Sequence, residues 1–303
     1  MKISKAEHLG MCFGVRDAIA LAMKQSNGQP LTILGELVHN EAVLQTLRNS
    51  GIQFAKPDDS LRTERVMITA HGTSQRIVSE LKIDGHIVIE ATCPLVHFAH
   101  RALHNLVGAG FHPVIIGRAE HVEVRGMTGD LTDYDVISSE AEIASLTERP
   151  RFGIVSQTTQ PIQKVRYLVE LIRQRFPKSE VKFSDTVCQP TKNRQSAAVD
   201  LAKKCDLVIV IGGAHSNNTR ELVSSCKRFC ERVFHAQSAD DLQIEWFADV
   251  EEVGITAGTS TPDSIIHEVE RRIHEFARKR DEDRFVMGAR ERNPLTFQLN
   301  TGK

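Results

Sequence analysis

The chain has 303 residues, a formal net charge of -1, 41% hydrophobic residues and 25% charged residues, a composition typical of a folded globular protein. The near-neutral charge and the 5% aromatic content argue against broad nucleic-acid or anionic-membrane binding and against a base-stacking platform. No apolar stretch approaches the roughly 18 residues of a membrane span, and the first residues lack a secretory apolar segment. We therefore expect a cytoplasmic enzyme with neither a nucleic-acid nor a membrane partner.

Short β-branched runs alternate with amphipathic segments along the chain. Ten runs are predicted strands: 31–37, 65–71, 86–92, 112–117, 134–138, 151–157, 180–185, 206–213, 232–236 and 252–258. Helical periodicity is clearest over 15–25, 96–110, 161–176 and 193–205. This alternation predicts βαβ units with parallel sheets and right-handed crossovers. The stretch 278–303 is charged and irregular, so we expect a tail laid over the fold or a partly mobile end.

Polar side chains follow directly after many of these predicted strands. They occur at His39-Asn40, His71 to Ser74, Thr92-Cys93, His121 to Glu123, Thr158-Thr159, Cys188, Ser216 to Asn218 and Ser260 to Pro262. In parallel α/β sheets, ligands bind beyond the carboxyl ends of the strands. The small donors ahead of the helical segments at Ser216 and Ser260 suit a phosphate group. Helix capping is the alternative, which explains Asp263 well but three histidines poorly.

Three of the six cysteines stand in turn-rich contexts, about one in each third of the chain: Cys12, Cys93 and Cys188. With no Cys-x-x-Cys pair and no export signal, the thiols are expected to stay reduced. Three similar α/β units that each offer one thiolate would suit a shared metal or cluster. Burial as small hydrophobic side chains is the alternative.

Two other groups of side chains are expected to be structural. Cys226 and Cys230 are four residues apart in a helical segment, so we expect them to share one face and to pack in the core. His97, His100 and His104 also share a predicted helix face. That spacing suits a metal, but a solvated helix face is the expected role.

Familiar catalytic loops are missing from the sequence. The chain contains neither a Walker loop nor a Gly-x-Gly-x-x-Gly loop, and neither His-Glu-x-x-His nor Gly-x-Ser-x-Gly. A standard nucleotide pocket, a zincin site and a serine-hydrolase site therefore lack support.

Nine ordered blocks resemble the 4-hydroxy-3-methylbut-2-enyl diphosphate reductase family, the last enzymes of the methylerythritol phosphate route to isoprenoids. The blocks are CFGVRDAI, ELVHN, TAHGTS, EATCPLV, HVEVRG, SQTTQ, the Cys-x-x-Thr-x-Asn-Arg-Gln run at 188–195, SNNTREL and TAGTSTPD. The resemblance covers nearly the whole chain. It implies three α/β units around a pseudo-threefold axis with a cluster at the centre: 10–92, 93–187 and 188–275, followed by a charged tail over 276–303.

The resemblance also implies the chemistry. A 4Fe–4S cluster would be bound by the three cysteines that stand apart, leaving one iron open, and would pass two electrons to (E)-4-hydroxy-3-methylbut-2-enyl diphosphate. Loss of the hydroxyl group would give isopentenyl and dimethylallyl diphosphate. Electrons would come from an external ferredoxin or flavodoxin, since no flavin or nicotinamide loop is present.

The family's site residues can be carried over block by block. Glu123 is the expected proton donor, assisted by Thr158 and His121, and the expected substrate-binding residues are His39, His71, His121, Thr158, Ser216, Asn217, Asn218 and Ser260. The ligands of the cluster are Cys12, Cys93 and Cys188.

The sequence departs from the family pattern at three positions. Val122 replaces the usual proline between His121 and Glu123, so the turn that holds the proton donor is expected to be less rigid. Arg118 stands where many members carry a histidine, and its charge is expected either to pair with Glu123 and lower that acid's pKa or to add anion affinity. Asn217 replaces a serine or glycine.

Two other functions remain open from the sequence. An iron–sulfur sensor or binding protein on the same scaffold would not need Glu123 and Thr158. A zinc-dependent phosphohydrolase would use the three thiolates with an open position, although such sites more often use histidine or carboxylate ligands.

Overall fold

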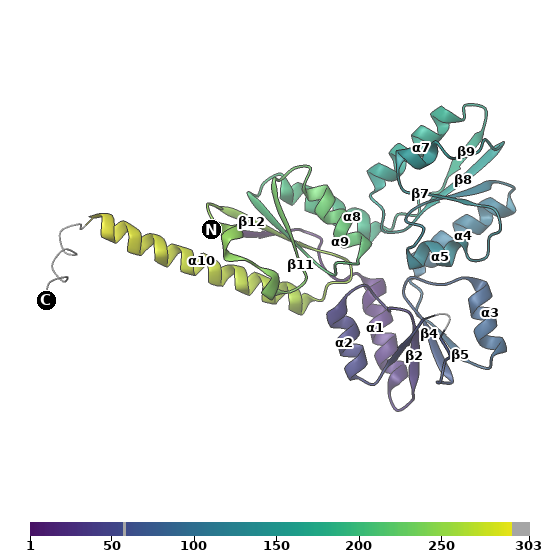
Figure 1. Ribbon diagram of the computed structural model, residues 1–303, viewed down its shortest axis with the longest axis horizontal. Coiled ribbons are helices and arrows are strands. Elements are labelled where there is room, and N and C mark those ends of the chain that lie inside the picture. The colour runs from purple at the N-terminus through teal and green to yellow at the C-terminus, as the bar shows by residue number, and fades with distance from the viewer. Residues whose placement is uncertain (57–58, 293–303) are drawn as a thin grey trace.

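The computed structural model describes residues 1–56 and 59–292, which form three α/β units that meet at a common centre (Figure 1). Each unit has one sheet of four strands, and all the strand pairs in the described residues are parallel. The predicted fold class, three similar α/β units with parallel sheets, is therefore confirmed. All ten predicted strands form, with ends that shift by a few residues.

The first unit runs from the first helix to the fourth strand of its sheet. Its elements are α1 (Phe13–Ser26), β2 (Leu31–Leu34), α2 (Glu41–Asn49), β3 (Gln53–Ala55), β4 (Arg65–Ile68), α3 (Gln75–Ile83) and β5 (Ile87–Glu90). The sheet order is β3-β2-β4-β5. Strand β2 is buried at all four residues, which fits a central strand of a parallel sheet.

The second unit repeats this order of strands. It comprises α4 (Pro94–Gly108), β6 (His112–Ile116), α5 (Val122–Thr128), β7 (Asp135–Ile137), α6 (Glu140–Ile143), β8 (Arg151–Ser156), α7 (Ile162–Arg175) and β9 (Glu180–Phe183). The sheet order is β7-β6-β8-β9.

The third unit takes its fourth strand from the start of the chain. It comprises α8 (Gln189–Ala202), β10 (Leu207–Ile211), α9 (Asn217–Cys226), β11 (Arg232–Ala236), two 3-10 helices η1 (Ala239–Asp241) and η2 (Ile244–Phe247), β12 (Glu252–Ala257) and α10 (Asp263–Arg292). Strand β1 (Lys2–Lys5) pairs with β12, giving the order β1-β12-β10-β11. We propose the boundaries 10–92, 93–187 and 188–275, with β1 completing the third sheet.

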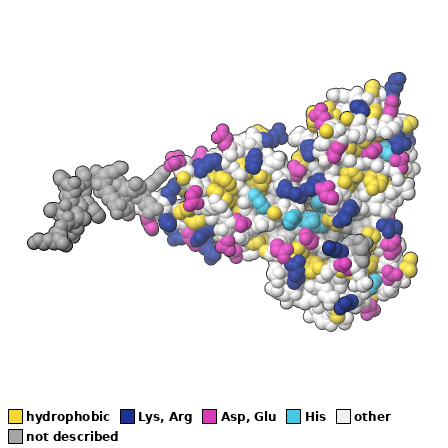
Figure 2. All heavy atoms as spheres, in the orientation of Figure 1, with side chains coloured by type: hydrophobic (Ala, Val, Ile, Leu, Met, Phe, Trp, Pro, Cys, Tyr) yellow, Lys and Arg dark blue, Asp and Glu magenta, His cyan; other side chains and the backbone are white. Residues whose placement is uncertain are grey.

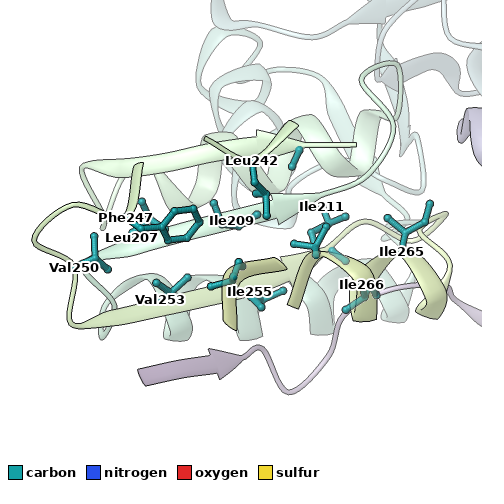
Figure 3. Packing of buried hydrophobic residues seen from close by; sticks show 14 residues of the cluster. Leu207, Ile209, Ile211, Leu242, Phe247, Val250, Val253, Ile255, Ile265 and Ile266 are labelled. Carbon is teal, nitrogen blue, oxygen red and sulfur yellow. The ribbon is translucent and has the colours of Figure 1, made fainter. Parts of the chain in front are cut away.

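The core of the third unit shows how each sheet is covered. Leu207, Ile209 and Ile211 of β10 point to the same side as alternate residues of β12 and are covered by the first turns of α10 (Figure 3). These side chains are buried, and each is worth about 1.5–3 kcal/mol of burial free energy. Helix α10 is thereby anchored by its N-terminal half.

The prediction that the chain is irregular from Arg278 onward is wrong as far as Arg292, because α10 continues to that residue. The stretch is rich in arginine, a good helix former, and its first proline is Pro294. The end of the expected tail, residues 293–303, lies outside the described residues. No helix of the described chain is long and apolar enough to cross a membrane.

Candidate functional site

The three cysteines that stand apart in the sequence occupy equivalent places in the three units. Cys12, Cys93 and Cys188 are the N-cap residues of α1, α4 and α8. Each cysteine follows the fourth strand of one sheet and precedes the first helix of the next unit: β1, β5 and β9 lead into these loops. The repeated topology therefore brings one thiol per unit to the centre.

The three thiols are near enough to act on one another electrostatically. A thiolate at Cys12 acts on both Cys93 and Cys188. Space for Cys93 is provided by Gly14, where a Cβ atom would lie 2.5 Å from the Cys93 Sγ atom. Among the described residues, no three His, Cys, Asp or Glu side chains converge as ligands of a single ion.

Burial favours the neutral form of two of these thiols. Burial raises the pKa of Cys93 and raises that of Cys188 to about 11. Backbone N–H groups of the helices oppose this effect: Leu95 and Val96 act on Cys93, and Thr191 acts on Cys188. A bound metal centre would displace the thiol protons, and the helix N-termini favour the thiolates that result. Thiolates are the ligands that iron–sulfur clusters require, so the donor set fits the expected 4Fe–4S cluster.

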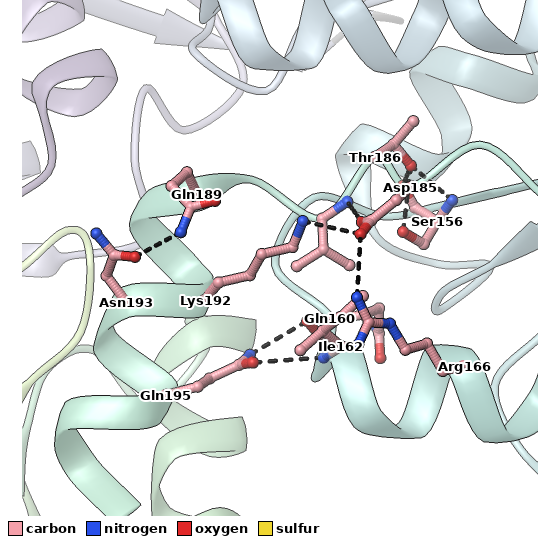
Figure 4. A network of polar contacts seen from close by, with 11 residues as sticks. Ser156, Gln160, Ile162, Arg166, Asp185, Thr186, Gln189, Lys192, Asn193 and Gln195 are labelled. Carbon is pink, nitrogen blue, oxygen red and sulfur yellow. Dashed lines mark hydrogen bonds and ion pairs between the residues drawn. The ribbon is translucent and has the colours of Figure 1, made fainter.

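The loop that carries Cys188 is fixed by polar contacts (Figure 4). Asp185 accepts hydrogen bonds from the backbone N–H of Val187 at 3.2 Å and from Lys192 Nζ at 2.9 Å. The Thr186 side chain bonds to both the backbone N–H and the C=O of Ser156. The thiol is therefore held from both sides of its loop.

Three histidines from two units form one cluster. His39 and His71 follow β2 and β4 of the first sheet, and His121 follows β6 of the second. The ring centroids of His39 and His71 are 4.4 Å apart, and the ring centroid of His121 lies 5.4 Å from that of His39 and 5.8 Å from that of His71. Figure 2 shows histidine side chains at the junction of the units. The structure thus brings together the three predicted histidines.

Burial makes two of these imidazoles neutral. Burial lowers the pKa of His71 well below its usual range and lowers that of His121 to about 3. The backbone N–H of Glu123 donates to His121 Nδ1 at 3.2 Å, so the neutral ring carries its proton on Nε2. His39 Nδ1 lies 3.0 Å from a carboxylate oxygen of Glu36. Each ring is oriented before any ligand binds.

The third unit supplies hydroxyl and amide groups to the same cavity. Its lining combines the histidines with Val15, Val38, Thr159, Ser216, Asn217, Asn218, Thr259 and Ser260. Ser216 caps α9, the Asn217 amide donates to the backbone carbonyl of Thr159 at 3.2 Å, and Ser260 donates to the carbonyl of His39 at 3.2 Å. These bonds join the third unit to the other two.

Unsatisfied polar atoms mark this cavity as a binding site. His39 Nε2, His71 Nδ1 and Asn218 Nδ2 are buried, and none has a hydrogen-bond partner within the described chain. Buried polar groups are normally bonded, so such a group calls for a polar ligand. The cavity measures about 40 Å³, room for a few water molecules. A diphosphate would therefore require the lining side chains to move apart.

Glu123 and Thr158 form a buried pair from the second unit. The backbone N–H of Thr158 donates to Glu123 Oε1 at 2.6 Å, and Thr158 Oγ1 donates to Oε2 at 3.0 Å. Both residues are buried. Burial raises the pKa of Glu123 to about 7, although the two bonds from Thr158 act in the opposite direction. The acid is therefore poised to hold or release a proton near neutral pH.

The departures from the family pattern have local consequences. Arg118 pairs with Glu120 and not with Glu123, so the hypothesis that it lowers the pKa of the proton donor is wrong. Glu120 lies two residues further along the same loop, whereas Glu123 is buried and bonded to Thr158. Val122 begins α5, and His121 caps that helix with its ring, which holds the turn without a proline.

The expected structural residues are only partly as predicted. Cys226 and Cys230 pack in a core cluster, as predicted, but they do not share a helix face because α9 ends at Cys226. On α4, His104 is exposed and His97 lies 3.3 Å from Glu90. His100 is not solvated: its Nε2 atom is buried near Gly72, and burial lowers its pKa to about 4.

Sequence reasoning missed several residues of the site. Thr159 and Thr259 line the cavity, and Glu36 orients His39. All three lie inside the matched blocks SQTTQ, TAGTSTPD and ELVHN, so the blocks were the available signal. Gly14 also lies inside a matched block, CFGVRDAI, but its close approach to Cys93 could not be predicted, because that contact joins residues far apart along the chain.

Comparison with known proteins agrees with this geometry. Residues 3–274 match the LytB protein family. A 4-hydroxy-3-methylbut-2-enyl diphosphate reductase of Thermoanaerobacter sp. (strain X514) is 34% identical over 291 residues, covering 93% of this chain and 100% of that protein. The enzyme of the same name from Aquifex aeolicus (strain VF5) is 37% identical over 278 residues, covering 89% and 95%.

A solved structure extends the comparison to the fold. The E-1-hydroxy-2-methyl-but-2-enyl-4-diphosphate reductase from Plasmodium falciparum superposes with a TM-score of 0.81 at 26% identity, covering 90% of this chain and 87% of that one. The resemblance found in the nine blocks is thus confirmed over nearly the whole length, and the chain belongs to the LytB family.

Proposed function

We propose that this protein is an oxidoreductase that reductively removes the hydroxyl group of (E)-4-hydroxy-3-methylbut-2-enyl diphosphate. Two electrons and two protons enter, and water leaves together with isopentenyl diphosphate or dimethylallyl diphosphate. The observation that carries the proposal is the buried Glu123–Thr158 pair next to the histidine cavity. Membership of the LytB family and the names of the relatives support the same reaction.

The histidine cavity is suited to the diphosphate group. Nε2–H of His121 and the Asn218 amide can donate hydrogen bonds to phosphate oxygens, and Ser216 and Ser260 add hydroxyl groups. The N-terminus of α9, a helix of 10 residues, adds a favourable dipole. Held by these groups from all three units, the substrate would have its allylic end fixed in one position, which lowers the entropic part of the barrier.

Glu123 is suited to deliver a proton to the departing hydroxyl group. It lies between the two halves of the site: its backbone N–H contacts the His121 ring, and its charge acts on Cys93 and Cys188. With a pKa of about 7, a substantial fraction is protonated at neutral pH. Thr158 holds both carboxyl oxygens and thereby sets the direction in which the proton is presented.

Cys12, Cys93 and Cys188 are the residues that would hold the 4Fe–4S cluster. When bound, such a cluster with one iron free of cysteine supplies electrons and a Lewis-acidic metal. Thiolates are the usual ligands of such clusters, and each of the three would bind one iron. The electrons are expected from an external reduced carrier of the ferredoxin or flavodoxin type.

The first test is the metal content of protein purified without oxygen. About four iron and four acid-labile sulfide per chain are expected, as for a cubane cluster. Turnover of the allylic diphosphate with reduced methyl viologen should follow. A loaded cluster without turnover would favour a sensor, and zinc without sulfide would favour the phosphohydrolase.

Substitutions test the residue roles. Replacement of Cys12, Cys93 or Cys188 by serine should each impair cluster assembly, whereas Cys226→Ser, in the core of the third unit, should leave the iron content unchanged. Glu123→Gln should keep the cluster and lose most turnover, by about 10²-fold or more, as expected for a general acid. Normal turnover of Glu123→Gln would place the proton donor elsewhere.

A further inference from the structure

Arg194 is a buried cation that the catalytic scheme above does not use. It lies on α8, six residues after Cys188, and its side chain is only 8% exposed. Burial lowers the pKa of this guanidinium from its usual value, the expected direction for a cation removed from water. A buried charge is costly in free energy unless an opposite charge or hydrogen-bond partners compensate it. The groups around Arg194 therefore indicate its role.

The hydrogen-bond partners of Arg194 in the described part of the chain are backbone carbonyl groups. Its Nε and Nη2 atoms donate to the carbonyl of Gly10 at 2.9 Å and 2.6 Å, and Nη1 donates to the carbonyl of Pro190 at 3.0 Å. Gly10 precedes Cys12 by two residues and Pro190 follows Cys188 by two. The side chain therefore ties the Cys12 loop to the helix that begins at Cys188.

These contacts use three of the five N–H groups of Arg194 but leave its charge without a carboxylate. Among the side chains that the structure describes, no acidic group forms an ion pair with it. The groups whose charges act on it are the thiols of Cys12 and Cys188, which attract it, and Arg16, which repels it. Compensation therefore arises only when those thiols are thiolates, as they are when they ligate iron.

We propose that Arg194 is a positioning residue for the iron–sulfur cluster: it holds two of the three ligand loops together, and its buried positive charge raises the reduction potential of the cluster. The proposal rests on the cluster put forward under Proposed function. Reduction adds negative charge to a centre that already carries three thiolates, so a nearby cation in a low-dielectric setting favours the reduced form.

A neutral hydrogen-bond donor would be enough if Arg194 served only to hold the loops. The two roles can therefore be separated by substitution. Arg194→Gln removes the charge and retains a donor, whereas Arg194→Lys retains the charge and loses the two-pronged bond to Gly10. Arg16→Gln is the matched control, because Arg16 is an exposed arginine on α1 that pairs with Asp263 at 3.0 Å.

The experiment measures iron, sulfide and the midpoint potential of the four anaerobically purified proteins. In Arg194→Gln we expect the equilibrium constant for one-electron reduction to fall about tenfold, a shift of about 59 mV to more negative potential. Arg194→Lys and Arg16→Gln should stay within about twofold of the unsubstituted protein, since one keeps the charge and the other removes a screened one.

The outcomes distinguish a role for the charge of Arg194 from a purely structural role. Fully loaded Arg194→Gln with an unchanged potential would overturn the proposal, and the expected shift would support it. If Arg194→Gln loses the cluster, Arg194→Lys decides: a loaded cluster with an unshifted potential supports the proposal, and a tenfold shift or loss of the cluster overturns it. Absence of iron and sulfide from the unsubstituted protein would instead contradict the cluster itself, which separates the two failures.

Discussion

At the scale of single residues, the site depends on how Thr158 holds Glu123. Burial and the hydrogen bonds from Thr158 have opposite effects on the pKa of Glu123, which is about 7 as a result. Thr158→Val removes the hydroxyl donor to Oε2 but keeps the backbone donor to Oε1. A hydrogen bond to a charged group is worth about 1.5–3 kcal/mol, so the pKa should rise by about one to two units.

The expected result is a shift of the pH profile as well as a lower rate. Activity that requires protonated Glu123 falls as pH rises through its pKa, so the alkaline limb in Thr158→Val should move to higher pH. Reduced methyl viologen is the suitable reductant, because its potential does not vary with pH. Thr158→Ser, which keeps the hydroxyl group, should leave the limb in place. A limb that stays at the same pH in Thr158→Val would show that another group titrates.

At the scale of elements, the close approach of the N-termini of α1 and α4 depends on a glycine, which has no side chain. Gly14 lies in the first turn of α1, and a Cβ atom there would lie 2.5 Å from Cys93 Sγ and 3.2 Å from Cys93 Cβ. Gly14→Ala should therefore displace the Cys93 thiol and weaken retention of the cluster by about tenfold or more, as for changes next to metal ligands. Iron per chain after gel filtration measures the effect.

The matched control for Gly14→Ala is Gly108→Ala. Gly108 is also helical, at the end of α4, and a Cβ atom there would meet nothing within 4 Å. That substitution should leave iron unchanged and stabilise the fold by about 0.5–1 kcal/mol at most, because alanine favours helix. Equal iron in the two variants would mean that the N-termini of α1 and α4 separate without loss of the site.

The two strands that the sequence did not predict share a physical reason. Strands β1 and β3 have four and three residues, lie at sheet edges and carry little apolar alternation, so they depend on the neighbouring strand. The ten predicted strands include the buried central strands, which can be recognised in the sequence by their continuous apolar runs. Helix α9 ends at Cys226, earlier than its periodicity indicates, because the chain must turn to enter β11.

The same distinction applies to the site. Residue types at strand ends could be read from the sequence, and the resemblance selected the cysteines, the histidines and Glu123. Three contacts could not be predicted from the sequence. They are the stacking of His39 on His71, the two hydrogen bonds that Thr158 donates to Glu123, and the hydrogen bond from Arg194 to the Gly10 carbonyl. The first two contacts lie within the first and second units, and the third joins the third unit to the Cys12 loop. In each case the partners are far apart in the sequence, where local periodicity carries no information.

At the scale of the whole molecule, the cysteines lie where one unit passes into the next, so a bound cluster cross-links all three units. A ligand that binds only the folded state stabilises that state. We therefore predict that removal of the cluster by a chelator and an oxidant lowers the melting temperature of the entire protein. The three units should then unfold at different temperatures instead of together. Circular dichroism recorded during anaerobic heating, with and without the cluster, measures this.

Two substitutions distinguish cross-linking from ordinary destabilisation. Cys12→Ser should abolish the difference between the two forms, because it removes a ligand from the loop between β1 and α1. Cys226→Ala leaves a cavity in the core of the third unit and should lower both melting temperatures by a similar amount, preserving the difference. Cys12→Ser could instead melt at the temperature of the loaded protein. The units would then be held together by their own interfaces, such as the hydrogen bond from Ser260 to the His39 carbonyl. In that case the cluster would bind to a scaffold that is already rigid without it.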